Sequence, residues 1–288
     1  MTPMLGKIMK FPRLFRSNGI DHVLLHCHLF KNAGTTIDWA LKRSLGWGFV
    51  DHRRDRAMIK GGMRYVENYL ALRGYVMALS SHHMPFDPGF ESRRFRYWHI
   101  IMLREPIVRC ASVYQYEKIQ PPVSLGARMA KKLDMRGYFE WRMQDQTPVT
   151  IKNYFTRYFS GIKNPARRLQ QQDYDAALTR AAAGNVLVGT VERFDESMVL
   201  FENMLQDYFK DLDMAYLRQN QNSTRPTDAL TYLREQLGEA LFSELLDKNA
   251  FDTRLYERLT ADFEMRISKI SDFQQRLAAF RQRCSLLN

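Results

Sequence analysis

Cysteine is scarce in this chain of 288 residues, which contains only Cys27, Cys110 and Cys284. An odd number of cysteines at wide spacing argues against a disulfide framework and against a cysteine-ligated zinc site. Cys27 and Cys110 lie within apolar runs, so we expect both to be small buried hydrophobic residues. A reducing compartment is the simpler expectation for such a protein.

Long apolar runs are missing as well. No stretch approaches the roughly 18 apolar residues that a membrane span needs. The first 20 residues alternate basic and apolar side chains without a continuous apolar core or a small-residue cleavage site, unlike a signal peptide. We expect residues 1–20 to form a loose basic tail, with a weak contact to a membrane surface as the alternative.

Acidic residues are in the minority, because 43 Lys and Arg stand against 31 Asp and Glu, a net charge of +12. This excess favours an anionic partner, such as a nucleotide, an acidic glycan, nucleic acid or an acidic membrane surface. An apolar content of 45% excludes global disorder. Without repeats or low-complexity linkers, a chain of this length fits one large domain.

Four apolar runs predict β-strands, at residues 22–29, 75–80, 97–103 and 185–191. Near-continuous apolar runs are typical of parallel strands that are buried on both faces. Helical spacing follows the first run at Ile37, Ala40, Leu41 and Leu45, and further helices are predicted at 107–118 and 196–209. Strands that alternate with helices indicate a doubly wound parallel sheet.

Two regions are interpreted as helical additions to that sheet. Residues 120–172 are rich in aromatic and basic side chains and look helical and irregular, and the apolar spacing from residue 227 onward is helical almost throughout. We therefore predict a single domain over residues 21–288, with a helical insertion at about 120–172 and C-terminal helices.

The segment Leu29 to Thr36 follows a predicted strand and opens a predicted helix. That position offers unpaired backbone N–H groups and the positive end of the helix dipole, which together bind an anion. Gly34 allows close approach of a phosphate, Lys31 adds positive charge, and Thr35 and Thr36 add hydroxyl groups. The Walker pattern is absent and no acidic metal ligand is apparent nearby, which disfavours a magnesium-dependent NTPase. An ordinary strand-to-helix turn is the alternative.

This segment resembles the 5′-phosphosulfate loop of sulfotransferases that use 3′-phosphoadenosine 5′-phosphosulfate (PAPS). The similarity is greatest to the carbohydrate branch, with the heparan sulfate 2-O- and 6-O-sulfotransferases and bacterial relatives. Phe30 and Ala33 replace a proline and a glycine of the usual Pro-Lys-x-Gly-Gly-Thr pattern. The resemblance implies a donor-binding loop that consists of Lys31, Asn32, Ala33, Gly34, Thr35 and Thr36.

A second phosphate site is indicated by Arg104, which ends a predicted strand, and by Ser112, eight residues later on a predicted helix. Arginine at a strand end can contact a phosphate through two N–H groups, although a structural salt bridge is the alternative. The pair resembles the family's 3′-phosphate motif. Residues 222–226 resemble the basic loop that closes over the nucleotide, which implies donor contacts from Ser223, Thr224 and Arg225.

Further matches to the family lie at 153–158, at 188–197 and at Asn249, Asp252, Leu255 and Tyr256, so that the resemblance spans about residues 22–260. Glu192 and Asp195 within it are interpreted as packing and helix-start groups. The implied fold is a P-loop-like three-layer α/β fold with a central parallel sheet and added helices, that is, a sulfotransferase domain.

A general base is needed to remove the proton of an acceptor hydroxyl, and histidine suits that role. His82 and His83 follow a predicted strand, at the sheet edge where ligands bind in such folds. The segment 81–86 is similar to the family's Gly-His-x-Pro-aromatic segment, and aligning the proline places His83 on the catalytic histidine. We favour His83 and keep His82 as the second candidate.

The other histidines are interpreted as packed or surface residues, namely His22, His26, His28, His52 and His99. His26 and His28 alternate on one strand like a metal-binding pair, but the sequence suggests no third ligand, so we expect no metal site.

The resemblance implies a sulfotransferase that moves a sulfuryl group from PAPS to a hydroxyl of a carbohydrate or glycolipid acceptor, without a metal. Lys31 would stabilise the departing phosphate. Two basic clusters are candidates for holding an acidic glycan across a cleft, or are solvated faces: 52–64 and 93–96. Six aromatic residues are candidates for stacking on sugar rings, or are core: Tyr138, Phe139, Trp141, Tyr154, Phe155 and Tyr158.

Two other functions stay open. A P-loop-like nucleotide kinase or NTPase would need Mg²⁺ and prefer ATP, and a basic non-enzymatic binder of anionic polymers or membrane would show steep salt dependence. We expect no nucleic-acid partner and a cytoplasmic location, with association at the inner membrane surface as an alternative. The sequence does not predict the oligomeric state.

Overall fold

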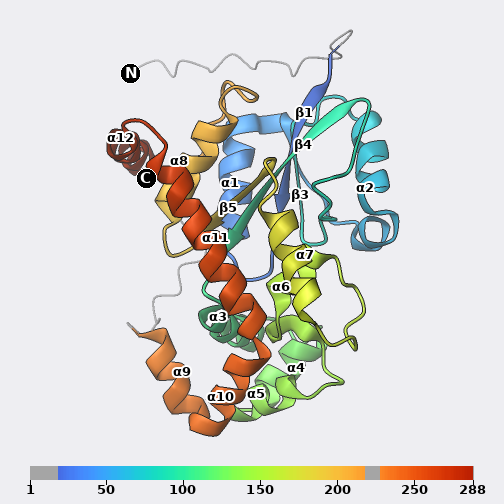
Figure 1. Cartoon of the computed structure of the whole chain (residues 1–288), viewed down its shortest axis with the longest axis vertical. Helices are drawn as coiled ribbons and strands as arrows, with labels where there is room; N and C mark the ends of the chain where they lie inside the picture. The colour runs from blue at the N-terminus through green and yellow to red at the C-terminus, as the bar shows by residue number, and fades with distance from the viewer. Residues whose placement is uncertain (1–18, 218–227, 288) are drawn as a thin grey trace, which may run out of the picture.

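A five-stranded parallel sheet forms the centre of the protein, in a computed structural model that describes residues 19–217 and 228–287 (Figure 1). The strand order is β2-β3-β1-β4-β5, and every adjacent pair is parallel. The strands are β1 (Asp21–Cys27), β2 (Phe49–Asp51), β3 (Ala78–Ser81), β4 (Phe95–Leu103) and β5 (Val186–Thr190).

Both faces of the sheet are buried, which explains the continuous apolar runs. On β1, Val23, Leu25 and Cys27 belong to one apolar core, whereas Leu24 belongs to the core on the other face. The four predicted strands are confirmed with ends shifted by a few residues. β2 was not predicted, because three residues that pair only with β3 carry too little pattern.

Helices cover the sheet on both sides, which confirms the three-layer α/β fold (Figure 1). One layer contains α2 (Asp55–Ala71), α6 (Tyr154–Ser160), α7 (Gln171–Ala181) and the first half of α11 (Ala250–Ser268). The other contains α1 (Gly34–Leu45), α8 (Phe194–Leu205) and α12 (Phe273–Ser285). Short 3-10 turns lie at η1 (Gly46–Gly48) and η2 (Val149–Ile151).

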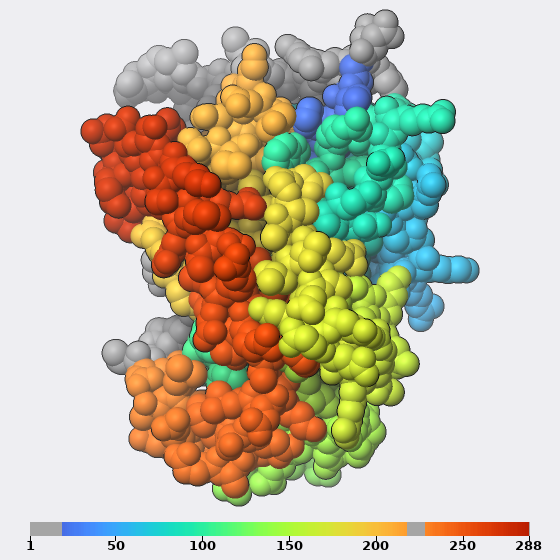
Figure 2. All heavy atoms as spheres, in the orientation of Figure 1, coloured from blue at the N-terminus to red at the C-terminus, as the bar shows by residue number. Residues whose placement is uncertain are grey.

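A helical lobe with its own apolar core lies beyond the carboxyl end of the sheet. It consists of α3 (Pro106–Ile119), α4 (Leu125–Lys132), α5 (Met135–Met143), α9 (Ala229–Leu237) and α10 (Glu239–Lys248). Figure 2 shows its orange and green segments packed together at one end of the molecule. No helix in the described ranges is both long and apolar enough to cross a membrane.

The segments before α6 and α11 cap each other. The buried Asp252 carboxylate accepts hydrogen bonds from the Phe155 and Thr156 backbone N–H groups and from the Thr156 hydroxyl, each at 2.8 Å. Asn249 Oδ1 accepts from the Asn153 N–H at 3.1 Å, and Asn153 Oδ1 accepts from the Asp252 N–H at 3.0 Å. We call this set of hydrogen bonds the α6–α11 latch. It gives a structural role to two segments, 153–158 and 249–256, for which the resemblance to the family implied no role.

The latch also reaches the loop after β1, because the Tyr154 hydroxyl accepts a hydrogen bond from the Phe30 N–H at 3.3 Å. Arg109 supports the same contact. Its guanidinium is fully buried, lies 4.4 Å from the Tyr154 ring and donates to the Thr150 carbonyl at 2.6 Å. The α6–α11 latch is therefore linked to the candidate donor loop.

Replacement of Asp252 by Ala should lower the free energy of unfolding by about 3 kcal/mol or more, because three buried donors lose their acceptor. Asp252→Asn, which keeps one acceptor oxygen, should cost less. Urea denaturation followed by circular dichroism measures both. The control is Asp247→Ala on exposed α10 sequence, which should change stability by no more than about 0.5 kcal/mol. An equal loss of unfolding free energy in Asp252→Ala and Asp247→Ala would contradict a stabilising role of the latch.

Candidate active site

The carboxyl edge of the sheet brings the predicted site segments together. Residues 28–33 leave the central strand β1, His82 follows β3 on one side, and Arg104 follows β4 on the other. Adjacent strands lie about 5 Å apart, so these segments are neighbours across the edge. The strand order, which the sequence does not state, thus places the predicted base and the predicted 3′-phosphate arginine on opposite sides of the predicted 5′-phosphosulfate loop.

The loop after β1 presents an uncapped helix start. α1 begins at Gly34, has no side-chain cap and carries no acidic residue in its first turn. Lys31 and Ala33 have positive φ angles of 67° and 58°. A left-handed residue at position 33 explains why the family pattern has glycine there, since alanine tolerates this conformation poorly. An uncapped start without acids leaves the positive end of α1 available to an anion.

Two side chains of the loop are oriented by nearby groups. The Lys31 ammonium lies 4.3 Å from the centroid of the Tyr116 ring of α3. Asn32 donates to the Phe30 carbonyl at 3.0 Å, while its buried Oδ1 has no hydrogen-bond partner in the described part of the chain. A buried acceptor without a partner is costly, so this atom is suited to a donor group from a bound ligand.

Gly34 is required by the imidazole that lies beneath it. A Cβ atom at position 34 would lie 2.2 Å from Cδ2 and 2.5 Å from Nε2 of His28. No L side chain fits at that separation without displacing the ring. Close approach of a phosphate was the predicted reason for glycine at position 34. The His28 ring is a second and independent reason.

His28 belongs to a buried network that sequence reasoning missed. The two oxygens of Asp38 accept hydrogen bonds from His26 Nδ1 at 2.7 Å and from His28 Nδ1 at 2.8 Å. Burial alone would raise the pKa of Asp38, but the two imidazoles outweigh it and lower this pKa strongly. Burial lowers the pKa of His28. A neutral His28 that donates from Nδ1 keeps an unprotonated Nε2.

The prediction that His26 and His28 lack a third candidate ligand was wrong. α1 folds back over β1, so that Asp38 joins the two histidines, and one candidate ligand atom from each residue lies within 4.8 Å of the others. The Nδ1 atoms and both carboxylate oxygens are already used in hydrogen bonds between these residues. The cluster therefore has the chemistry of a hydrogen-bonded support for the loop.

His82 packs on this network. Its ring centroid lies 4.0 Å from that of His28, and its Nδ1 donates to the His28 carbonyl at 3.1 Å. Because a carbonyl only accepts, the Nδ1 proton is fixed there and the neutral ring keeps its lone pair on Nε2. Burial, followed by the charges of His28 and Arg53, lowers the pKa of His82 to about 4. His82 is thus a neutral, oriented imidazole at neutral pH.

His83 has a different environment. Its side chain is about half exposed, and its Nε2 lies 3.9 Å from Asp55 Oδ2 at the start of α2. Its backbone N–H donates to the Ser81 hydroxyl at 3.2 Å, and the Tyr158 hydroxyl donates to the next carbonyl, that of Met84, at 3.0 Å. The backbone of this turn is thereby fixed, while the His83 ring lies on the outside of it.

Arg104 and Ser112 are both largely buried, the first just after β4 and the second on α3. Glu105 caps α3 by accepting from the Val108 N–H at 2.6 Å. Its own N–H donates at 3.0 Å to Glu192, which also accepts from the Tyr256 hydroxyl at 2.8 Å. Glu192 therefore has the structural role that was expected of it. Ser223, Thr224 and Arg225 lie outside the described residues.

The two basic clusters do not flank one cleft. Arg53, Arg54 and Arg56 follow β2 at the carboxyl edge, whereas Arg93 and Arg94 precede β4 at the opposite edge of the sheet. The interpretation of both clusters as walls of one glycan site is therefore wrong for 93–96. The sugar-stacking interpretation is wrong for three of the six aromatic residues, because Tyr138, Phe139 and Phe155 are fully buried.

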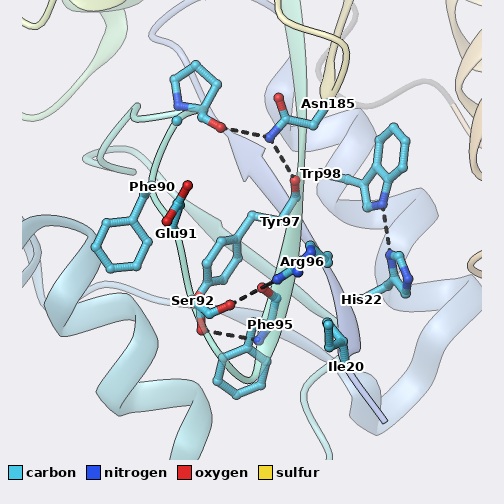
Figure 3. Close-up of a pocket in the computed structure, with 12 residues that line it drawn as sticks. Ile20, His22, Phe90, Glu91, Ser92, Phe95, Arg96, Tyr97, Trp98 and Asn185 are labelled. Atoms are coloured by element: carbon cyan, nitrogen blue, oxygen red, sulfur yellow. Dashed lines mark hydrogen bonds between the residues drawn. The ribbon is translucent and has the colours of Figure 1, made fainter.

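A surface hollow of about 830 Å³ lies away from these groups (Figure 3). It is lined by residues at the amino ends of β1 and β4, including Phe90 and Trp98, and Trp98 Nε1 donates to His22 Nδ1 at 3.1 Å. Ligands of parallel α/β sheets bind at the carboxyl edge, so this hollow is not the candidate active site.

The chain is similar to known proteins over most of its length. The model of the sulfotransferase family matches residues 20–265. An uncharacterized protein of Archaeoglobus fulgidus is 25% identical over 245 residues, which cover 82% of this chain and 95% of that protein.

Replacement of Gly34 by Ala should destabilise the protein by about 1–3 kcal/mol through overpacking against His28. The same change at Gly184, where a Cβ meets nothing within 4 Å, is the control and should not destabilise. In a His28→Ala background, the cost of Gly34→Ala should disappear. Thermal unfolding of the four variants measures this, and a cost that persists without the His28 ring would refute the steric explanation.

Proposed function

This chain belongs to the sulfotransferase family, and we propose that it transfers a sulfuryl group from PAPS to a hydroxyl group of a carbohydrate or glycolipid acceptor. The observation that carries the proposal is the uncapped positive end of α1 beside Lys31, between His82 on one side and Arg104 on the other. This arrangement offers an anion site and a base at the same sheet edge.

The donor fits the residues on both sides of the loop. The first N–H groups of α1, Lys31, Thr35 and Thr36 would hold the 5′-phosphosulfate, and the buried Asn32 Oδ1 could accept from a donor group of the nucleotide. Arg104 and Ser112 would hold the 3′-phosphate. The proposal extends to donor contacts from Ser223, Thr224 and Arg225. When bound, PAPS supplies the sulfuryl group and a bisphosphate leaving group, and no metal is needed.

His82 is the base in this proposal, with His83 as the competing residue. His82 Nε2 carries a lone pair, the ring is held by the His28 carbonyl, and it lies beside the donor loop. It would take the proton of the acceptor hydroxyl as the oxygen attacks sulfur in line. Lys31 and the α1 amides would stabilise the negative charge that builds on the departing phosphate oxygen.

We propose an acceptor that is anionic, or whose hydroxyl groups lie near a charged group of the acceptor. Arg53 and Arg54 are exposed at the carboxyl edge, and the charge of Arg53 contributes to lowering the pKa of His82. These side chains would contact an acidic sugar that approaches His82. The three cysteines are free thiols, which supports the proposal of a reducing, cytoplasmic setting.

Calorimetric titration of 3′-phosphoadenosine 5′-phosphate tests the donor site. The wild type should bind it and discriminate against AMP and against ATP with Mg²⁺. Lys31→Ala should weaken binding by about 10- to 100-fold, the worth of one charge-assisted hydrogen bond. Lys60→Ala, on an exposed position of α2, is the control and should bind like the wild type. A preference for ATP with Mg²⁺ would instead favour the kinase.

Removal of the base should separate the two histidines. His82→Ala should lower kcat by about 10²- to 10⁴-fold, and His83→Ala should have a small effect. Since the base acts in its neutral form and the pKa of His82 is lowered to about 4, kcat/KM should stay flat as the pH falls below 6.5 and decline only near 4. A decline well above pH 4 would contradict His82 as the base, and a larger loss in His83→Ala would assign the base to His83.

A further inference from the structure

The connection between α3 and α4 is an exposed apolar loop. Ile119 is 67% exposed, Val123 83% and Leu125 47%, and the two prolines between them, at positions 121 and 122, are exposed as well. Single exposed apolar residues are normal, but five of them within seven consecutive residues concentrate apolar surface in one loop, which is typical of an interaction site. Residues 119–125 are named the apolar loop below.

The apolar loop has few polar groups that need water. Its prolines have no N–H, the Gln120 N–H donates to the Tyr116 carbonyl at 3.1 Å, and the Val123 N–H donates to the Pro121 carbonyl at 2.7 Å. Ser124 Oγ accepts from the Ala127 N–H at 3.1 Å as the cap of α4. Internally paired groups lower the cost of moving this segment out of water.

Four cations surround the apolar loop, namely Lys118, Arg128, Lys131 and Lys132. Within the described ranges none of them forms an ion pair, and three donate to backbone carbonyls: Lys118 to Leu133, Arg128 to Val123 and Lys131 to Lys118. The nearest acids along the chain are engaged elsewhere. Glu117 pairs with buried Arg142, and Asp134 caps α5. Asp134 keeps its charge as a cap, so the four cations leave a local excess of positive charge.

The apolar loop is close to the candidate active site. Tyr116, one helical turn before Ile119 on α3, contacts both the Lys31 ammonium at 4.3 Å and the Phe30 ring at 5.4 Å. A second group of exposed apolar residues, Trp47, Leu72 and Met77, lies near the amino edge of the sheet, away from the site. Of the two, only the apolar loop could bring a surface toward the donor loop.

We propose that the apolar loop and the four surrounding cations dock the enzyme onto an anionic lipid bilayer. The apolar side chains enter the interface while the cations contact lipid phosphates, as in other peripheral proteins. The acceptor is then a lipid-linked one whose head group reaches the site from the bilayer, and this part rests on the proposed function. Charge complementarity favours a bilayer over a second copy of this chain, which carries the same net positive charge of +12.

Sedimentation of the full chain with vesicles tests the docking surface. Wild type should bind vesicles of equal parts phosphatidylcholine and phosphatidylglycerol and bind phosphatidylcholine alone weakly. The double variant Ile119→Glu with Val123→Glu should bind at least about tenfold more weakly, since each inserted side chain is worth about that factor. Lys131→Gln with Lys132→Gln should weaken binding about fivefold for each cation removed, on the anionic vesicles only.

Leu72→Glu is the matched control, because Leu72 is 82% exposed but lies away from the site. It should bind like the wild type. Binding that is unchanged in the apolar-loop variant, or lost equally in Leu72→Glu, would overturn the proposal, and so would a wild-type dimer that the apolar-loop variant dissociates in gel filtration. Vesicle binding needs neither donor nor acceptor, so a protein that docks but does not bind 3′-phosphoadenosine 5′-phosphate would refute the proposed function and leave the docking intact.

Discussion

The carboxylate of Asp38, buried between two imidazoles, fixes the junction of β1 with α1. Burial of an unpaired carboxylate costs several kcal/mol, whereas charge-assisted hydrogen bonds return about 1.5–3 kcal/mol each. His26 on β1 and His28, one residue past its end, provide two such bonds. The His28 ring occupies the space that a side chain at position 34 would need, so residue 34 is glycine. The same ring packs against His82, and the His28 carbonyl accepts a hydrogen bond from His82 Nδ1. The conformation of the donor loop and the orientation of the proposed base therefore both depend on the Asp38 carboxylate.

Most of the fold could be predicted from the sequence, because buried parallel strands and amphipathic helices leave strong patterns. β1 was expected to extend to residue 29 but ends at Cys27, since His28 and Leu29 continue the apolar run while their backbone already turns into the loop. The helix α2 was not predicted, because its many basic residues obscure the helical spacing of its apolar residues. Its basic residues from Arg56 to Arg64 were considered as a cluster of charge, although Met58 and Met63 between them and Val66 after them face the core.

The candidate site was predictable where chemistry depends on neighbours in the chain, and not where it depends on distant ones. Lys31, Gly34 and Arg104 occur in short motifs, so their residue types and spacing indicated a phosphate site. The Asp38 network joins positions on β1 and α1 that only the fold brings together. The contrast between the environments of His82 and His83, adjacent in sequence, depends on packing against His28 and on the position of Asp55, and no sequence pattern reports either.

The α6–α11 latch has a consequence for the order in which the protein is made. Tyr154, which accepts a hydrogen bond from the Phe30 N–H, lies at the start of the helix α6 that Asp252 caps, so a segment near the start of the chain is linked to one near its end. While the ribosome still covers α11, the nascent protein has its central strands but not the support of its donor loop. The donor site that we propose would thus be completed only after α11 has been made.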